Sequence, residues 1–298
     1  MLACNVYVSE GRDRSVVKQL TAHAEQDEQV VVAHTFVDES YNRTGFTLAS
    51  AGQDTLVAAA ARLAQAALHA VDLQRHAATH PRLGVVDHVL CSPLGSADLA
   101  QAARAAKAIA GGLADGNPPV PVYLYGAVHP QGRRLADIRR ALGYFAGARA
   151  GQWVGPGSPV SGALPVAPDL GPHAADARVG VCTIGAAPLV INFNVPLTGV
   201  DLAGARLIAR EVSARGGGLP AVEAMALPHG DGVEVACNLL DCGVSAPADV
   251  EALVRRLALE AGGAVLAPYT TGCTEKEIID MVLAREKRNA NALCTDQS

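Results

Sequence analysis

Apolar positions along the first third of the chain switch between a two-residue and a 3.6-residue period. Short runs rich in β-branched side chains predict strands at residues 2–8, 30–37, 44–49 and 84–90. Apolar side chains at helical spacing predict helices between them, at residues 12–24 and 53–75. The predicted order is β-α-β-β-α-β, and a helix over 97–113 and a strand over 120–125 follow it.

The second half of the chain repeats this pattern. Strands are predicted at residues 189–195, 222–227, 233–240 and 264–266, and helices at 202–215 and 248–260. This β-α-β-β-α-β order is that of ferredoxin-like units. Its repetition predicts an α/β (α+β) protein built from two similar subdomains that face each other.

A stretch dense in glycine and proline, residues 147–172, separates the two halves and contains the only tryptophan, Trp153. Stretches of this length without regular structure are commonly functional or act as linkers. We predict an N-terminal subdomain over 1–172, which includes this connector, and a C-terminal subdomain over 173–288. Residues 289–298 are polar and are expected to form a frayed tail.

Composition narrows the class of protein. Half of the residues are apolar and 18% are charged, which allows a sizeable core. A net charge of −5 argues against nucleic acid as a partner. No apolar run approaches the length of a membrane span. The seven cysteines are scattered and form no CxxC, which favours a reducing compartment. We therefore expect a cytoplasmic protein.

The run RHAATHPRLGVVDHV, residues 75–89, raises the question of a metal site, since His76 and His80 are four residues apart. A metalloprotease helix requires HExxH, in which the glutamate is the base, and that glutamate is absent here. Pro81 also disfavours helical geometry at His80, so the two imidazoles are not expected to share a helical face. We predict no metal.

The same run also fits acid–base chemistry. His80 and Arg82 lie in a loop between a long helix and a strand, where catalytic groups concentrate. Asp87 lies on the strand, and a buried carboxylate requires a partner, so it can orient His80 or pair with an arginine. A plainer alternative stays open, in which Asp87 caps a turn and His80 is a solvated loop residue. Strict alternation places His88 on the opposite face from Asp87.

Three further motifs carry polar side chains at strand ends or on strands. Ser9-Glu10-Gly11 follows the first strand, and Asn42-Arg43-Thr44 lies between two strands. Asn192-Phe193-Asn194 places two amides on one face of an apolar strand, where they require partners. Each motif also has a structural explanation, as a helix cap, a hairpin turn or a hydrogen bond to backbone.

The motifs, in this order, resemble the formiminotransferase domain of glutamate formimidoyltransferases and of formiminotransferase-cyclodeaminases. The resemblance rests on SEG (9–11), NRT (42–44), RH (75–76), HPR-x-G-x-x-D (80–87), VYLYG (122–126), PDxGP (168–172), FN (193–194) and NLLD (238–241). It spans most of the chain, which makes it more specific than any single motif. The chain resembles a short stand-alone relative, without a cyclodeaminase domain.

The resemblance implies two subdomains with a cleft or folate tunnel between them, a homodimer, and transfer of a formimino group from N-formimino-L-glutamate to N5 of tetrahydrofolate. It implies tetrahydrofolate as co-substrate and no metal. His80 is the implied general acid and base, with Asp87 beside it. The implied substrate- and folate-binding residues are Glu10, Asn42, Arg43, Arg82, Tyr125, Gly126, Asn194 and Asn238.

One segment departs from the family pattern. After PDLGP, family members have a loop rich in Ser, Phe, Pro and Trp that contacts the folate, whereas residues 173–179 here read HAADARV. A second hypothesis is therefore a folate-binding protein of the same fold without transferase activity. A third is an unrelated metal-dependent hydrolase that uses His76, His80 and His88.

Overall fold

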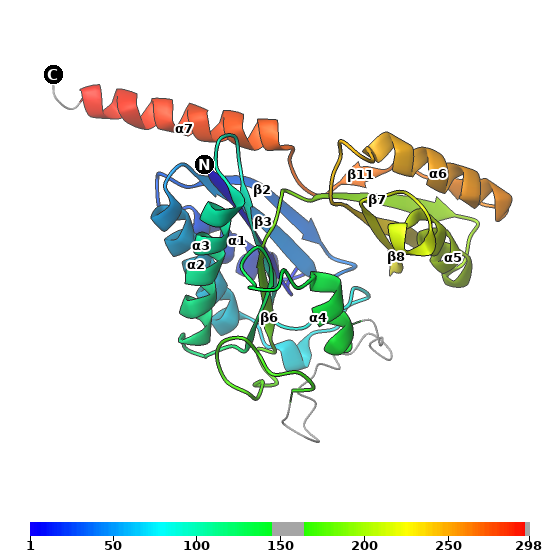
Figure 1. The fold of residues 1–298 in the computed structure, drawn as a ribbon, viewed down its shortest axis with the longest axis horizontal. Coiled ribbons are helices and arrows are strands. Elements are labelled where there is room, and N and C mark those ends of the chain that lie inside the picture. The colour runs from blue at the N-terminus through cyan, green and yellow to red at the C-terminus, as the bar shows by residue number, and fades with distance from the viewer. Residues whose placement is uncertain (145–163, 296–298) are drawn as a thin grey trace. The chain divides into compact units, whose positions relative to one another are not determined.

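The computed structural model describes residues 1–144 and 164–295 and divides the chain into two compact units (Figure 1). The first unit spans Met1–Ala187 and Thr274–Ser298, and the second spans Pro188–Cys273. Most of the predicted 147–172 connector, with Trp153, lies outside the described residues.

The first unit begins with the predicted β-α-β-β-α-β order. Its elements are β1 (Leu2–Val8), α1 (Arg14–Ala24), β2 (Val31–Asp38), β3 (Arg43–Ser50), α2 (Gln53–Ala70), β4 (Val86–Pro93), α3 (Leu99–Ala114), β5 (Val122–Gly126), α4 (Leu135–Ala141), β6 (Cys182–Ala186) and, at the C-terminus, α7 (Glu275–Thr295). The six strands form one sheet in the order β2-β3-β1-β4-β6-β5. β1 to β4 pair antiparallel, as a split βαβ arrangement requires, and β6 and β5 extend the sheet in parallel with β4.

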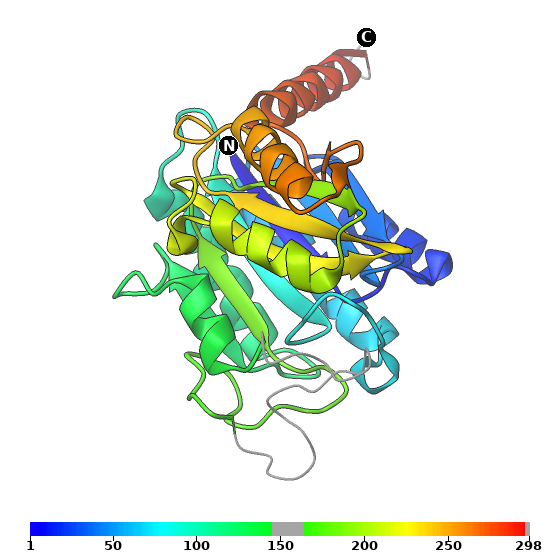
Figure 2. The same cartoon turned by 90° about the vertical axis from the view of Figure 1, so that its right-hand side faces the viewer.

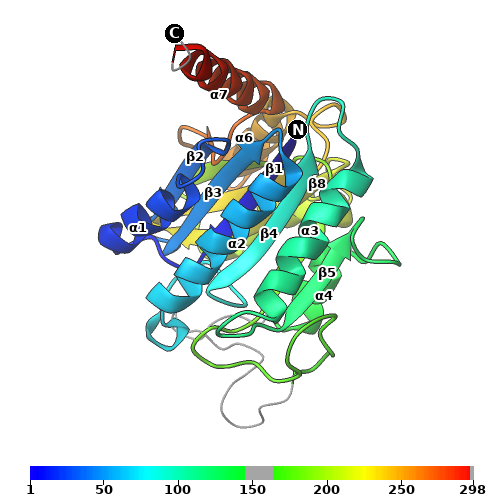
Figure 3. The same ribbon diagram turned by 90° about the vertical axis from the view of Figure 1, so that its left-hand side faces the viewer.

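Helices α1, α2 and α3 cover one face of this sheet (Figure 3). Asp13 caps α1, and Asp98 with Gln101 forms a capping box at the start of α3. The buried faces of α2 and α3 consist largely of alanine, which lets the two helices pack closely on each other and on the sheet. The core of this unit lies between the helices and the sheet.

The second unit has the same order of elements. They are β7 (Ile191–Thr198), α5 (Leu202–Val212), β8 (Val222–His229), β9 (Gly232–Leu239), α6 (Pro247–Glu260), β10 (Ala264–Val265) and β11 (Tyr269–Thr270). The sheet order is β10-β7-β9-β8, with β11 also paired to β7. Helices α5 and α6 lie on one face of this sheet and enclose a separate core (Figure 2).

The α/β fold class with two separate sheets is thereby confirmed within the described residues, and each unit carries the ferredoxin-like strand order. That the two units face each other across a cleft or tunnel stays a prediction.

The structural division differs from the predicted boundary between residues 172 and 173. Residues 182–186 form β6, which pairs between β4 and β5, so the first unit continues to Ala187. The chain also returns to the first unit at Thr274, because α7 contacts β2 and β3. This last helix continues to Thr295, where a frayed tail from residue 289 was expected.

The helix predicted over 53–75 also ends early. α2 stops at Ala70, and Leu73–Arg75 forms a separate 3-10 turn that the Asp72 side chain caps. His76 follows this turn and His80 lies in a loop. The two imidazoles therefore do not share a helical face, as the position of Pro81 predicted.

Candidate active site

Three loops of the first unit meet at Asn42. This residue has φ = 45°, a left-handed conformation that asparagine tolerates better than most side chains. Its Oδ1 accepts from the Gly11 N–H at 2.9 Å and its Nδ2 donates to the Ala77 carbonyl at 3.3 Å. His76 Nε2 donates to the Asn42 carbonyl at 2.9 Å. The Asn42 amide therefore joins the SEG, NRT and HPR loops to one another.

Arg82 holds the loop that contains His80. Its guanidinium is buried and donates to the carbonyls of His76 at 3.0 Å and His80 at 3.3 Å. Burial lowers the pKa of Arg82 to about 10. The structure thus gives Arg82 a local role in shaping the loop.

His80 is half-buried and lies edge-on to the Tyr41 ring, with the ring centroids 5.0 Å apart. The Pro81 carbonyl lies 2.6 Å from its Nδ1, closer than the Arg43 guanidinium at 3.3 Å. A carbonyl only accepts, so the proton belongs on Nδ1 and the lone pair on Nε2. Burial, and then the charge of Arg43, lower the pKa of His80 well below its usual value. The side chain is therefore a neutral imidazole with a free basic nitrogen.

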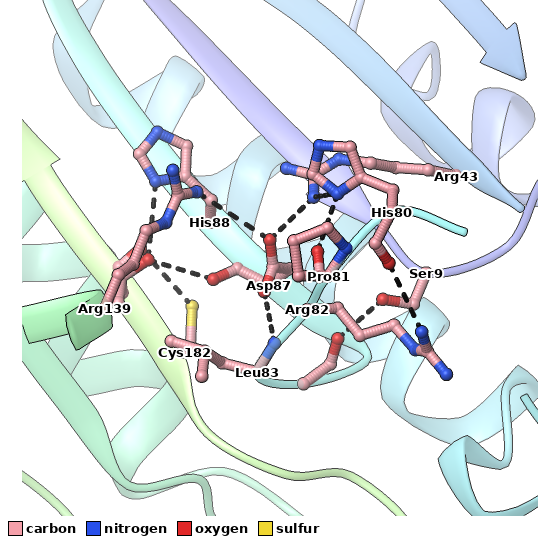
Figure 4. Close-up of polar contacts among 12 residues, drawn as sticks. Ser9, Arg43, His80, Pro81, Arg82, Leu83, Asp87, His88, Arg139 and Cys182 are labelled. Atoms are coloured by element: carbon pink, nitrogen blue, oxygen red, sulfur yellow. Dashed lines mark hydrogen bonds and ion pairs between the residues drawn. The ribbon is translucent and has the colours of Figure 1, made fainter. Parts of the chain in front are cut away.

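Asp87 is almost completely buried, with 1% of its surface exposed. Its Oδ1 accepts from the Leu83 N–H at 2.6 Å, and its Oδ2 accepts from Arg43 Nη1 at 2.8 Å. The same Arg43 nitrogen lies beside His80 Nδ1 (Figure 4). Of the two roles that the sequence allowed Asp87, the structure shows the pairing with an arginine, and Arg43 links the carboxylate to His80.

A β-bulge determines where Asp87 points. In the pairing of β1 with β4, Tyr7 opposes His88 and Val8 opposes Val86, so Asp87 is the extra residue. The predicted strict alternation is therefore wrong at this position. Arg139 lies 3.9 Å from the Asp87 carboxylate. Burial, and then the charge of Arg139, lower the pKa of His88.

His88 is part of a buried chain of hydrogen bonds. The Thr183 hydroxyl donates to the Asp87 carbonyl at 2.9 Å, so it accepts from His88 Nδ1 at 3.4 Å. His88 Nε2 then accepts from the Tyr125 hydroxyl at 3.2 Å, and the two rings stack with centroids 5.5 Å apart. Burial raises the pKa of Tyr125 and lowers that of His88, which keeps both neutral.

Two residues of the site had no signal in the sequence motifs. Arg139 comes from α4, and its guanidinium lies over the Tyr144 ring, 4.5 Å from the centroid. Tyr144 also lies edge-on to His80, at 6.3 Å between centroids. The short α4 carries Arg139 and Arg140 next to each other, and no pattern in the sequence singles out either one, so only the fold identifies Arg139.

Glu10 and Gly126 have backbone roles at this end of the sheet. Glu10 Oε1 accepts from the N–H groups of Arg12 and Asp13. Gly126 has φ = 65°, and a Cβ there would lie 2.3 Å from the Ala186 carbonyl oxygen. Glycine is therefore required at this position by the close approach of β5 to β6.

The remaining predicted residues, Asn194 and Asn238, lie in the second unit. Asn194 Nδ2 donates to Glu234 Oε1 at 2.6 Å and lies 3.2 Å from the Tyr269 hydroxyl. Asn238 Oδ1 accepts from Asn192 Nδ2 at 2.7 Å. Glu234 is fully buried and was not singled out from the sequence. Asn194 and Asn238 thus belong to the second sheet, each with its own hydrogen-bond partners, while the other predicted site residues lie in the first unit.

Within residues 1–144 and 164–295, no group of three or more His, Cys, Asp or Glu side chains is arranged to hold a metal ion. Among these residues, no helix has the length and apolar character to cross a membrane. His76, His80 and His88 make separate contacts to backbone and hydroxyl groups, which does not support the metal-dependent hydrolase hypothesis.

A neutral histidine, a buried aspartate–arginine pair and a duplicated β-α-β-β-α-β fold define a class of α/β proteins suited to acid–base group transfer. Comparison with known proteins gives the family. Residues 1–187 match the formiminotransferase domain, N-terminal subdomain. The chain therefore belongs to the formiminotransferase family, as the sequence motifs indicated.

Several relatives support this assignment. The chain is 38% identical to the formiminotransferase cyclodeaminase-like protein of Arabidopsis thaliana, over 93% of this chain and 94% of that protein. It is 29% identical to the formimidoyltransferase-cyclodeaminase of Sus scrofa, over 66% of this chain but only 34% of that protein. It is 27% identical to the glutamate formimidoyltransferase of Streptococcus pyogenes serotype M1, over 73% and 69% of the two chains.

Proposed function

We propose that the protein is a folate-dependent one-carbon transferase that moves a formimino group from N-formimino-L-glutamate to N5 of tetrahydrofolate, with His80 as general acid and base. Membership of the formiminotransferase family supports the reaction class. The observation that carries the role of His80 is its neutral imidazole, fixed through Nδ1 by the Pro81 carbonyl.

The reaction needs one proton to be taken up and then returned. The formimino group reacts as its amidinium, H₂N⁺=CH–NH–. N5 of tetrahydrofolate attacks the formimino carbon, the C=N π electrons move to that nitrogen to leave a neutral C–NH₂ group, and a tetrahedral intermediate forms that carries the positive charge on N5. His80 Nε2 accepts the proton from N5 and then donates it to the glutamate nitrogen as the C–N bond to glutamate breaks. The products are 5-formiminotetrahydrofolate and glutamate, and His80 returns to its neutral form.

The surroundings of His80 suit this cycle. A lowered pKa keeps the basic nitrogen free before the reaction, and the resulting imidazolium is a strong acid toward the leaving nitrogen. Asp87 fixes Arg43 beside the ring. We assign Asp87 a positioning role, exerted through Arg43, because it makes no direct hydrogen bond to His80 within the described residues.

The proposed substrate contacts divide into two kinds. Asn42, Arg82 and Gly126 are proposed to act by shaping the loops and strand ends around His80, because Asn42 and Arg82 bond backbone groups of these loops and Gly126 lies against β6. Glu10, Arg43, Tyr125, Asn194 and Asn238 are the residues that we propose to contact the donor or the folate. Tetrahydrofolate enters as co-substrate, and the mechanism uses no metal.

A transfer assay with tetrahydrofolate and N-formimino-L-glutamate tests the proposal. Replacing His80 by alanine removes the proton carrier, so kcat is expected to fall by about 10²- to 10⁴-fold. His69→Ala is the matched control, since His69 is exposed on α2 and its Nδ1 bonds the Gln65 carbonyl of the same helix. The proposal fails if the wild-type protein transfers no formimino group, or if His80→Ala reacts at the wild-type rate.

A second candidate, a folate-binding protein without turnover, is favoured by residues 173–179. This run contains no aromatic side chain, whereas the corresponding family loop contacts the folate. In the structure, the Arg178 carbonyl accepts from the Leu73 N–H, and the Arg178 guanidinium lies 3.8 Å from Asp72. Calorimetry with tetrahydrofolate distinguishes the two candidates, because tight binding without turnover supports the second and absence of binding excludes both.

The cellular location and the assembly belong to the same proposal. Five cysteines of the described part of the chain, Cys4, Cys91, Cys182, Cys237 and Cys242, are free thiols, in keeping with a reducing, cytoplasmic environment. The homodimer follows from the family resemblance and stays a prediction.

A further inference from the structure

Arg139 is a mostly buried guanidinium that is only partly satisfied by the protein. Its side chain is 12% exposed and lies against the Tyr144 ring. Its nearest carboxylate oxygen, Asp87 Oδ2, is 3.9 Å from Nη2, beyond hydrogen-bond distance. No residue that the structure describes accepts a hydrogen bond from its buried Nε.

The charges around Arg139 do not balance. Asp87 already accepts from the Leu83 N–H and from Arg43, so its negative charge is shared between two guanidinium groups. His80 and His88 are neutral and add no charge. A buried charge without a partner is unfavourable. Arg43 and Arg139, together with Arg82 on the neighbouring loop, therefore outnumber the single Asp87 carboxylate before a ligand binds.

The guanidinium groups of Arg43 and Arg139 differ in how many of their N–H donors already have an acceptor in the protein. Arg43 Nη1 donates to Asp87 and lies against His80 Nδ1, while its Cζ stacks 4.7 Å from the Tyr7 ring centroid. The Nε of Arg139 has no acceptor among the described residues, and its Nη2 lies too far from Asp87 for a hydrogen bond. The edge of a planar guanidinium matches the two oxygens of a carboxylate.

We infer that Arg139 binds a carboxylate group of the formimino donor. The inference rests on the proposed function, which makes the donor a derivative of glutamate with two carboxylates. Arg139 lies 3.9 Å from Asp87, and the Tyr144 ring lies against Arg139 on one side and edge-on to His80. A ligand of Arg139 is therefore expected close to the reacting carbon. The carboxylates of the folate are separated from N5 by a benzoyl ring and its linker, whereas those of the donor stay within a few bonds of the transferred group.

Steady-state kinetics of Arg139 variants test the assignment. Losing a hydrogen bond to a charged group corresponds to about a 10- to 100-fold weaker interaction. Arg139→Gln is expected to raise the KM for N-formimino-L-glutamate by that factor and to leave the KM for tetrahydrofolate unchanged. Arg139→Lys, which keeps the charge but not the fork, is expected to be intermediate.

Arg140→Gln is the matched control. Arg140 lies next to Arg139 on α4, but it is 41% exposed and pairs with Asp137. This variant is expected to keep the wild-type KM for the donor. An Arg139→Gln variant with an unchanged donor KM, in a protein that transfers formimino groups, would overturn the inference and leave the proposed function intact.

Binding measurements on the unmutated protein separate the two claims. L-glutamate is expected to slow the modification of Arg139, but not of Arg140, by phenylglyoxal, as measured by peptide mass spectrometry. Protection by glutamate in a protein without transferase activity would retain the carboxylate site and remove the proposed function. Absence of protection, or protection by inorganic phosphate and not by glutamate, would refute the carboxylate assignment.

Discussion

Three histidines of the first unit are kept neutral by their surroundings. His76, His80 and His88 lie among arginines in places where burial disfavours a charged ring, and the pKa of each is lowered. His76 bonds the Asn42 carbonyl through Nε2, and its Nδ1 is buried without a partner in the described structure. Protonation of any of these rings therefore opposes folding.

This arrangement predicts a loss of stability in mild acid. The pKa of His76 falls from 6.5 to about 4 on folding. The unfolded chain therefore binds this proton first as the pH drops from about 6.5 to 4, and the folded state loses up to about 3 kcal/mol over that window. His76→Gln keeps an N–H for the Asn42 carbonyl but cannot titrate. Urea unfolding at pH 7 and pH 4.5 should show a smaller difference for this variant than for wild type.

His69→Gln serves as the control, because His69 is exposed on α2. Its unfolding midpoints should follow the wild-type pH dependence. An unchanged difference between pH 7 and pH 4.5 in His76→Gln would show that His76 does not contribute to the acid sensitivity.

The structure brings together three residues that the ordered motifs and the family resemblance had singled out. His80, Arg43 and Asp87 lie in short motifs, and a buried carboxylate such as Asp87 needs a charged partner. Arg139 was not predicted, since its role depends on α4 lying beside Asp87. The orientation of Asp87 relative to His88 was predicted wrongly, because a one-residue bulge changes the face of a strand without a clear mark in the sequence.

At the scale of elements, periodicity predicted the strands and helices that alternate locally. Periodicity predicted no strand at Cys182–Ala186, which forms β6. The partners of this strand, β4 and β5, are distant in the sequence. Parallel strands of this kind carry a short apolar run with no alternation to distinguish them. Periodicity also predicted too late an end for α2. The helix ends at Ala70, and the Asp72 side chain caps a separate 3-10 turn at Leu73–Arg75.

The contact between β5 and β6 gives a prediction about glycine. Gly126→Ala places a Cβ 2.3 Å from the Ala186 carbonyl oxygen, in a residue with φ = 65°. Gly132 has a similar φ of 60° but nothing within 4 Å of its missing Cβ. Gly132→Ala is therefore expected to cost about 1 kcal/mol of unfolding free energy, and Gly126→Ala about 3 kcal/mol.

Chemical denaturation of the two variants measures this difference. Equal losses would mean that the backbone conformation alone, and not the approach of β6, requires glycine at position 126. A large loss confined to Gly126→Ala would support the parallel pairing that the sequence did not predict.

At the scale of the whole molecule, the chain contains the same β-α-β-β-α-β arrangement twice, with the strand order of a split βαβ fold in both units. The repetition was predictable because each half carries its own periodic pattern. The boundary was not, because it depends on two long-range pairings, of β6 with the first sheet and of α7 with β2 and β3.

The resulting division predicts which fragment folds alone. Residues 188–273 contain the complete second sheet, both of its helices and a core of their own. This fragment is expected to unfold cooperatively and to give dispersed amide resonances. A fragment of residues 173–288 adds β6, which lacks β4 and β5 as partners, and part of α7, which lacks β2 and β3. Unpaired apolar strands promote association, so this longer fragment should aggregate more readily in sedimentation experiments. A well-behaved longer fragment beside an unfolded shorter one would contradict the boundary at residue 188.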